Sequence, residues 1–406
     1  MKLPAILVAL SLCLAVTGCQ STKIKANKLP RGVAVSKSVE LPNTTQVAYY
    51  LPNAATEHRF YLEQWNIWVD PGKGVKDGVH NAMQAYFPDA KPLDLTSDAT
   101  VGLLIDIDPK WSFNRGEAEM TITYRVFDAN QQEIRKGEKK YDTNLGNISD
   151  GTAFYNASLR ATQLMLVDIL NKLKPTAEKY AANLMMDTVD ARQLANLEKP
   201  VSSGTGFYIN ANGQLLTAAH VLNNCLVTKA GSGDDSIDVT LAAKSTLLDL
   251  AVIDTKQKTD KFLPFRKDVN LFLGESVTNV GYPLQGLLAA SPNLTRGNIS
   301  SRSALKGSVG QFQFSAPIQP GSSGGPVVSD GGELLGVTVS TLNSAKLIES
   351  GVLPQNVNFA LEAKYAAKFL TKHQIPFESV EPNMDGNISI ANDAALGSVV
   401  QLNCYQ

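Results

Sequence analysis

The sequence lacks a large net charge of either sign. Its 406 residues include 37 Lys and Arg and 38 Asp and Glu, which gives a formal net charge of −1. No long basic run occurs, so nothing indicates a nucleic-acid partner. Beyond residue 18 no apolar stretch is long enough to span a bilayer. Hydrophobic residues still make up 44% of the chain, which at this length predicts a globular protein with two or three domains.

Cysteine is also scarce, and two of the 4 cysteines lie near the N-terminus. A positive start followed by the apolar run Pro4–Val16 predicts a signal peptide over residues 1–18. The stretch AVTGC, which ends at Cys19, resembles a bacterial lipobox. The resemblance implies that Cys19 is lipidated, and Gln20 after it favours the outer membrane, facing the periplasm. An ordinary secretory signal with an incidental cysteine is the alternative.

The other two cysteines, Cys225 and Cys404, form an even pair in a chain expected in an oxidising compartment. We expect them to form a disulfide that holds the C-terminal segment beside the region of His220. Two buried free thiols are the open alternative.

The first half of the chain predicts a small α+β domain. Residues 19–43 are polar and basic and predict a tether. Residues 44–197 predict a sheet with helices on one face. Their apolar residues recur every two residues or about every four. The strands are expected over Val101–Ile107, over Met120–Val126 and up to Tyr141, and the helices over Val75–Phe87, over Thr152–Leu173 and from Pro175 to about Leu197.

No chemistry can be assigned to this domain from its residues. It has no cluster of catalytic groups, no metal-ligand spacing and no glycine-rich phosphate loop. Trp65, Trp68 and Trp111 indicate either a binding surface or core packing, and core packing is favoured. We therefore expect the domain to bind an unidentified envelope protein or to position the rest of the chain.

The second half carries three residue types that acyl transfer needs. Ser323 lies in the glycine-rich stretch Gly321–Pro326, whose backbone can turn tightly and aim N–H groups at an oxyanion. His220 follows a predicted hairpin and supplies a base for the serine hydroxyl. Asp249 is the one polar residue in the apolar run Leu247–Ile253, and a buried carboxylate needs a partner such as His220.

Four fragments in this order resemble the trypsin-like serine peptidases, and most closely their bacterial HtrA/Deg branch. The resemblance extends from about Gly204 to Phe377, and its fragments are GTGF from Gly204, TAAHV from Thr217, LDLAV from Leu248 and GSSGGP from Gly321. It implies an all-β domain over residues 198–378 with two six-stranded barrels and a closing helix near Lys364–His373. Residues 379–406 are then expected to be a tail, too short for the PDZ domain of that branch.

The resemblance also implies a role for each matched residue. His220 would be the general base, Asp249 the carboxylate that orients it, and Ser323 the nucleophile. The amides of Gly321 and Ser323 would form the oxyanion hole. Should Asp249 be a structural carboxylate, Asp238 and Asp254 are the fallback candidates. The sequence departs from the family pattern at Ser322, where Asn or Asp is common, and at Pro320 before the loop.

The same resemblance predicts the specificity. Pro317 stands where the base of the primary pocket lies, so no acid receives Lys or Arg there, and small or medium apolar side chains are expected. Val337, Thr338 and Val339 lie in the strand expected to pair with substrate. No metal or cofactor is required. The sequence therefore predicts a serine endopeptidase acting on envelope or secreted proteins. The alternative is a non-catalytic envelope adaptor whose peptidase-like domain binds peptides.

Overall fold

The computed structural model describes residues 23–114, 116–145, 151–231, 235–267, 270–283, 291–304, 308, 310–341 and 355–406. The chain divides into two compact units between Val189 and Asp190, and each is described by itself. No helix of the described residues is long and apolar enough to cross a membrane. The expected signal peptide and Cys19 lie outside the described residues, so cleavage and lipidation stay predictions.

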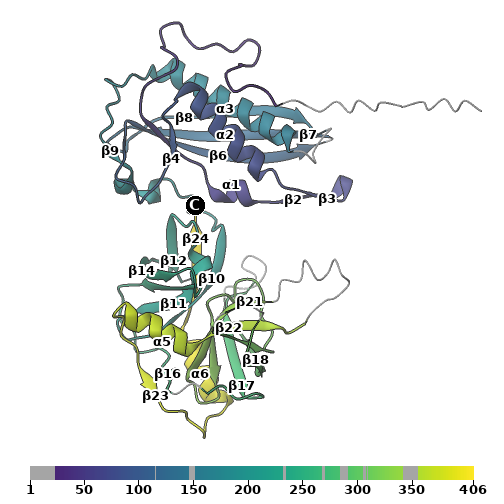
Figure 1. The fold of residues 1–406 in the computed structure, drawn as a ribbon, viewed down its shortest axis with the longest axis vertical. Coiled ribbons are helices and arrows are strands. Elements are labelled where there is room, and N and C mark those ends of the chain that lie inside the picture. The colour runs from purple at the N-terminus through teal and green to yellow at the C-terminus, as the bar shows by residue number, and fades with distance from the viewer. Residues whose placement is uncertain are drawn as a thin grey trace, which may run out of the picture. The chain divides into compact units, whose positions relative to one another are not determined.

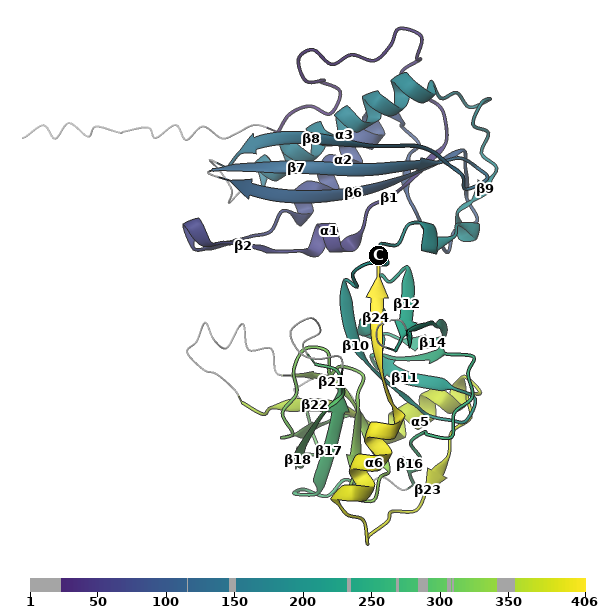
Figure 2. The same ribbon diagram turned by 180° about the vertical axis from the view of Figure 1, so that it is seen from behind.

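The first unit is a mixed sheet with two long helices on one of its faces (Figures 1 and 2). The strand order is β4-β1-β6-β7-β8, parallel for β1 with β4 and β6 and antiparallel for the others. The strands are β1 (Val47–Tyr50), β4 (Lys91–Pro92), β6 (Leu103–Asn114), β7 (Glu117–Phe127) and β8 (Glu133–Asn144), and the helices are α2 (Gly72–Tyr86) and α3 (Thr152–Leu173). The smaller elements are α1 (Asn53–Glu57), β2 (Phe60–Leu62), the 3-10 turn η1 (Glu63–Trp65), β3 (Ile67–Val69), β5 (Thr100–Val101), β9 (Leu184–Met185) and η3 (Met186–Thr188).

The residue pattern explains which face of the sheet the helices cover. In β7, Met120 and Ile122 are fully buried while Thr123 is exposed, because successive side chains of a strand point to opposite faces. In α2, Val75, Val79 and Met83 are fully buried, and their spacing of four places them on one side of the helix. These two apolar faces form one core cluster.

Three expectations for this unit are wrong. Residues 23–43 are not a free tether, since Ile24, Leu29 and Val35 pack against the core. The segment from Pro175 to Leu197 contains only β9 and two 3-10 turns, η3 and η4 (Ala191–Gln193), because its buried residues do not recur every three or four residues. Core packing holds for Trp111, whose ring centroid lies 5.1 Å from that of Phe154. Trp65 and Trp68 are 38% and 61% exposed, so they lie on the surface.

The second unit contains an open sheet of seven strands in the order β13-β12-β24-β10-β11-β15-β14. Two six-stranded barrels were expected, but no pairing between the outer strands β13 and β14 closes this sheet in the described residues. Its strands are β10 (Ser202–Tyr208), β11 (Gln214–Ala218), β12 (Val227–Ala230), β13 (Ile237–Asp238), β14 (Thr240–Ser245), β15 (Leu250–Asp254) and β24 (Val399–Tyr405).

The other sheet of this unit closes into a six-stranded barrel. Its order is β20-β17-β18-β19-β22-β21, and pairing of β20 with β21 completes the ring. Two short strands, β16 and β23, extend it beyond β21. The strands are β16 (Phe265–Arg266), β17 (Ser276–Gly281), β18 (Asn293–Ser301), β19 (Gln311–Phe314), β20 (Pro326–Ser329), β21 (Leu334–Thr341), β22 (Asn358–Glu362) and β23 (Ser379–Val380).

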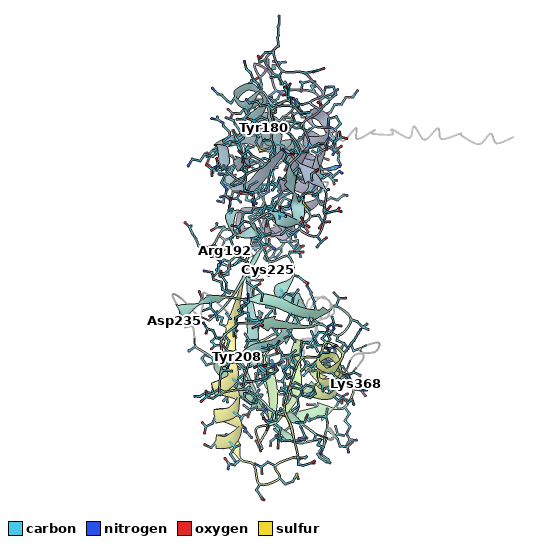
Figure 3. All side chains as sticks on the ribbon, turned by 90° about the vertical axis from the view of Figure 1, so that its left-hand side faces the viewer. Tyr180, Arg192, Tyr208, Cys225, Asp235 and Lys368 are labelled. Carbon is cyan, nitrogen blue, oxygen red and sulfur yellow. A yellow bond between two sulfur atoms is a disulfide. The ribbon has the colours of Figure 1, made fainter. Side chains whose placement is uncertain are left out.

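The C-terminal residues are part of this fold and not the expected tail. Residues Ile388–Ser398 form helix α6, and β24 after it lies between β12 and β10. Leu402 and Cys404 of β24 are buried, as expected for a strand in the middle of a sheet. The closing helix is α5 (Ala363–Lys372), which buries Phe369 and Leu370 and leaves Lys368 on the surface (Figure 3).

Candidate active site

His220 and Asp249 are joined by two hydrogen bonds. His220 lies in the 3-10 turn η5 (Ala219–Leu222), which directly follows β11. Its ring Nδ1 is 2.6 Å from Asp249 Oδ2, and its backbone N–H donates to Oδ1 at 2.8 Å. One carboxylate therefore fixes both the backbone and the ring of the histidine. With the proton on Nδ1, the other ring nitrogen is left as the acceptor that a general base needs.

Asp249 is not the buried carboxylate that its apolar neighbours predicted. It ends a turn just before β15, has a left-handed φ of +50°, and its side chain is 25% exposed. Leu247 in the same run is 85% exposed. The backbone of Asp249 also accepts a hydrogen bond from the N–H of Ala219 at 3.0 Å. The turn, and not burial in an apolar environment, therefore explains the pairing with His220.

The two fallback carboxylates have other partners. Asp254 accepts a hydrogen bond from the backbone N–H of Lys256 at 2.7 Å. Asp238 forms an ion pair with Arg192, which is labelled in Figure 3. No hydrogen bond joins either of them to His220 among the described residues.

The loop around Ser323 requires its glycines. Gly321 and Gly324 have φ values of +101° and +82°, which side chains rarely adopt. A Cβ atom at Gly321 would lie 2.4 Å from the carbonyl oxygen of Tyr282, and one at Gly324 would lie 2.2 Å from that of Thr205. The loop therefore keeps its shape only with hydrogen in place of a side chain at both positions.

Backbone hydrogen bonds tie this loop to both sheets of the second unit. The N–H of Thr205 in β10 donates to the carbonyl of Ser323 at 2.9 Å, and the N–H of Gly324 donates to the carbonyl of Thr338 in β21 at 2.8 Å. The Thr205 hydroxyl donates to the Gly321 carbonyl at 2.8 Å. Thr205 belongs to the family-like fragment GTGF, but the sequence did not predict that it supports the Ser323 loop.

The expected oxyanion hole has free donors. No described group accepts a hydrogen bond from the backbone N–H of Gly321 or of Ser323. The neighbouring amides of Ser322 and Gly325 instead close turns, by donating to Gln319 and Ser322 at 2.9 and 3.0 Å. Two main-chain donors are thus left for a negatively charged oxygen.

The Ser323 hydroxyl points to a backbone carbonyl. Its only hydrogen bond among the described residues joins Oγ to the carbonyl of Val339 at 3.4 Å, and none joins it to His220. The two residues nevertheless belong to adjoining segments, since a Cβ atom on Gly324 would lie 2.7 Å from the backbone nitrogen of Ala218.

The residues expected to form the substrate pocket differ in their exposure. Pro317 is exposed. Val337 and Thr338 are fully buried, Val337 in a core cluster and Thr338 with its hydroxyl accepting from Asn279 Nδ2 at 2.7 Å. Both side chains are fully buried, so neither lines an open pocket. Val339, with 8% exposure, is the one whose carbonyl touches Ser323.

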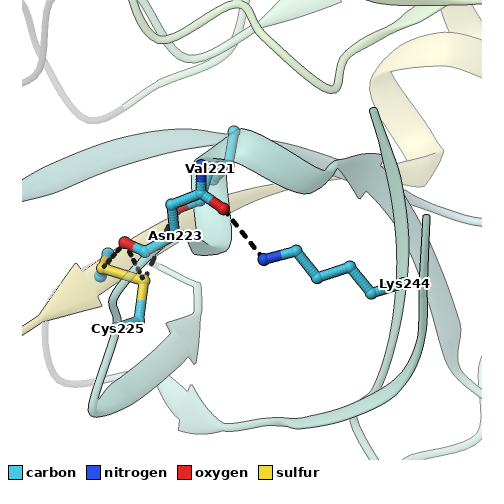
Figure 4. Close-up of a disulfide and its surroundings, with 5 residues drawn as sticks. Val221, Asn223, Cys225 and Lys244 are labelled. Carbon is cyan, nitrogen blue, oxygen red and sulfur yellow. Dashed lines mark hydrogen bonds between the residues drawn. A yellow bond between two sulfur atoms is a disulfide. The ribbon is translucent and has the colours of Figure 1, made fainter. Parts of the chain in front are cut away.

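A disulfide joins Cys225 and Cys404, with 5.2 Å between their Cα atoms (Figure 4). It links the segment after η5 to β24. Close by, Lys244 Nζ donates to Asn223 Oδ1 at 2.9 Å. The chain around His220 is therefore held to the sheet by a covalent bond as well as by hydrogen bonds. Among the described residues no group of three or more His, Cys, Asp and Glu side chains could hold a metal ion.

Comparisons with known proteins agree with this architecture. Residues 204–337 match the family model of the trypsin-like peptidase domain. An uncharacterized protein, y4bJ of Sinorhizobium fredii, is 37% identical over 176 residues, which cover 43% of this chain and 28% of that protein. The serine endoprotease DegS of Haemophilus influenzae is 26% identical over 237 residues, covering 57% and 63%.

A third relative is a probable periplasmic serine endoprotease, DegP-like, of Rhizobium meliloti. It is 32% identical over 149 residues, which cover 35% of this chain and 28% of that protein. The chain thus spans less than two thirds of the length of each of these three relatives. Residues 204–337 of the second unit are therefore similar to the trypsin-like peptidase domain, and parts of the chain are similar to serine endoproteases named DegS and DegP-like.

Proposed function

We propose that the protein is a serine endopeptidase that hydrolyses peptide bonds in envelope or secreted proteins. The observation that carries the proposal is the carboxylate of Asp249, which holds both the ring and the backbone of His220. A histidine oriented in this way, next to a glycine-rich loop that presents a serine, is the arrangement that acyl transfer requires.

The proposed reaction starts with rotation of the Ser323 hydroxyl from the Val339 carbonyl towards His220. The imidazole takes the hydroxyl proton while Oγ forms a bond to the scissile carbonyl carbon. The amides of Gly321 and Ser323 bind the resulting oxyanion, and loss of one such donor typically costs about 100- to 1,000-fold in turnover. The protonated imidazole then gives its proton to the leaving amine. Water attacks the acyl-enzyme in the same way and releases the second product.

The proposed specificity is for small or medium apolar side chains. Support comes from Pro317, which puts no acid at the position matched to the pocket base, and from the apolar Val339 beside Ser323. Sequencing the products of a peptide library would test this. We expect cleavage after small apolar residues, and cleavage mainly after Lys or Arg would contradict the proposal.

The proposed location is the cell envelope, with a lipid anchor on Cys19 in the outer membrane and the chain facing the periplasm. The lipobox-like stretch before Cys19 supports the anchor, and a relative named as periplasmic supports the compartment. The first unit would then position the peptidase or hold a partner protein of the envelope. We expect Cys19→Ser to move the protein from the membrane fraction to the soluble fraction, and an unchanged distribution would contradict the anchor.

One observation favours the alternative of a non-catalytic adaptor, namely that no hydrogen bond joins Ser323 to His220. Cleavage of an unfolded protein substrate, followed by gel electrophoresis, decides between the two functions. We expect the wild type to cleave it and Ser323→Ala to leave it intact. Ser303→Ala, which changes an exposed serine of the same barrel, serves as the matched control and should keep full activity. Peptide binding without cleavage by well-folded wild type would favour the adaptor.

A further inference from the structure

An exposed aromatic surface lies on the β2–β3 hairpin of the first unit. The two strands are joined by η1 and by Asn66, which has a left-handed φ of 52°. We call the four exposed large apolar side chains of this hairpin the hairpin surface: Tyr61, Trp65, Ile67 and Trp68, with exposed fractions of 45%, 38%, 38% and 61%. Large apolar side chains gathered on one small element indicate a binding surface.

The hairpin is fastened to the domain, so its aromatic side chains are presented in fixed positions. Leu62, Ile67 and Val69 alternate with Tyr61 and Trp68 along the strands and so lie on the other face, where Leu62 and Val69 are buried in a cluster with Phe154. The Tyr61 hydroxyl donates to Asn66 Oδ1 at 2.5 Å, and the Tyr61 and Trp68 ring centroids are 5.3 Å apart. Such pre-ordering lowers the entropic cost of binding.

The charges around the hairpin surface do not indicate an electrostatic partner. Arg59 lies with its guanidinium 5.8 Å from the centre of the Trp68 ring. The segment also carries the acidic residues Glu57, Glu63 and Asp70, so it is not basic. Tryptophan and tyrosine combine an apolar ring with a polar group, and for this reason they are enriched at the interface between lipid headgroups and acyl chains.

The first described residue, Lys23, contacts helix α3 next to the residue that packs against the hairpin, Phe154. Lys23 Nζ is 4.6 Å from the centre of the Tyr155 ring. The preceding residue of α3, Phe154, has its ring centroid 6.4 Å from that of Phe113, which in turn lies 5.1 Å from that of Phe60 in β2. Cys19 precedes Lys23 by four residues, a reach of at most about 14 Å.

We propose that the hairpin surface docks on the lipid bilayer at the level of the headgroups and holds the first unit against the membrane. The inference rests on the proposed anchor at Cys19, because an anchor there leaves this end of the domain beside the bilayer. The acyl chains on Cys19 would hold the chain at the membrane, and lipid contact through Trp65 and Trp68 would fix which face of the first unit lies against the bilayer.

Tryptophan quenching on vesicles tests the docking. The full chain is reconstituted into phosphatidylethanolamine and phosphatidylglycerol vesicles that contain a lipid with a nitroxide on its headgroup. We expect the fluorescence of the wild type to be quenched and the double variant Trp65→Ser, Trp68→Ser to lose most of that quenching. Trp111→Phe, which removes the half-buried tryptophan, should keep it. Circular dichroism checks that each variant is folded.

The outcomes separate this inference from the proposed anchor. A wild-type chain that floats with the vesicles but shows no quenching would overturn the docking and leave the anchor standing. A chain that does not float would overturn both. A photo-crosslinking residue at position 68 that captures a protein in intact cells, and no lipid, would also overturn the inference and identify the hairpin surface as a protein-binding site.

Discussion

At the scale of single residues, the proposed chemistry depends on one carboxylate that makes two bonds to one histidine. Asp249 accepts from the backbone N–H of His220 and from its ring nitrogen, at 2.8 and 2.6 Å. Asp249 has a left-handed φ of +50° and lies directly before β15. An amide in its place would keep the shape but would no longer stabilise the imidazolium.

We expect Asp249→Asn to lower the rate of labelling of Ser323 by a fluorophosphonate about 10⁴-fold, because the imidazole would be held in the wrong tautomer. Thermal unfolding should change little. Asp254→Asn is the matched control, since its carboxylate accepts only a local backbone bond to Lys256 among the described residues. Equal labelling rates for Asp249→Asn and the wild type would contradict the role of Asp249.

A comparison of Gly324, in the Ser323 loop, with Gly274, outside it, separates the cost of backbone strain from the cost of steric crowding. Gly324 and Gly274 both have a φ of +82°, but only at Gly324 would a Cβ atom meet other atoms, at 2.2 Å from the Thr205 carbonyl. We expect Gly274→Ala to lower the free energy of unfolding by about 1 to 2 kcal/mol. Gly324→Ala should cost about 1 to 3 kcal/mol more and abolish labelling. Urea denaturation measures both, and equal losses would contradict the close packing of the loop.

The sequence predicted residue types better than side-chain directions. His220, Asp249 and Ser323 could be proposed because acyl transfer needs a base, a carboxylate that orients it and a serine, here in a glycine-rich loop. Thr338 was expected to face substrate, yet its hydroxyl is buried with Asn279, because the direction of a side chain depends on how β21 pairs in the barrel. The direction of the Ser323 hydroxyl depends on a carbonyl 16 residues away, and no local pattern encodes it.

At the scale of elements, the C-terminal strand β24 completes the sheet that carries His220. It pairs with β10 on one side and with β12 on the other. The disulfide between Cys225 and Cys404 joins the same strand to the segment that follows η5. Strand β24 therefore supports the sheet next to the turn that carries His220.

We expect the double variant Cys225→Ser, Cys404→Ser to lose about 2 to 5 kcal/mol of the free energy of unfolding, since the bond closes a long loop. The loop spans 179 residues, so the entropy of the unfolded chain rises when the bond is removed. Urea denaturation followed by circular dichroism measures the loss. Reductant should destabilise the wild type in the same way and leave the variant unchanged, and an equal effect on both would contradict a bonded pair in solution.

Elements with a strong period could be predicted, and elements defined by distant partners could not. The helix expected at Thr152–Leu173 has those bounds in the structure, and the alternating run from Met120 to Val126 lies in β7. In contrast, β24 was expected to be a tail, because a seven-residue strand between β12 and β10 depends on neighbours far away in the sequence. The segment after Pro175, which was expected to be helical, instead contains β9, and β9 pairs with the distant strand β5.

At the scale of the whole molecule, the chain combines a peptidase-like second unit with a first unit that contains an ion pair with a buried carboxylate. In the first unit, Asp106 is buried and receives two hydrogen bonds from the Arg125 guanidinium, at 2.7 and 2.9 Å. Burial raises the pKa of Asp106 to about 6, and the Arg125 charge limits the rise. The folded unit therefore holds a proton on this carboxyl at a pH where the unfolded chain has released it.

The sign of the pH dependence follows from that raised pKa. Below pH 4 the carboxyl is protonated in both states, and between about pH 4 and 6 only the folded state keeps the proton. We therefore expect the free energy of unfolding of the first unit to fall by about 2 to 3 kcal/mol as the pH rises through this window. In Asp106→Asn that fall should be absent. All 3 tryptophans lie in the first unit, so their fluorescence in urea reports its unfolding, and parallel pH profiles would contradict the prediction.

The most direct test of the central claim is the mass of the intact protein after reaction with a fluorophosphonate, followed by peptide mapping. If His220 activates Ser323 beside the free amides of Gly321 and Ser323, the wild type gains one adduct, and it lies on Ser323. His220→Ala should then remain unlabelled under the same conditions. No adduct on well-folded wild type, or an adduct that persists in His220→Ala at the same rate, would contradict the account.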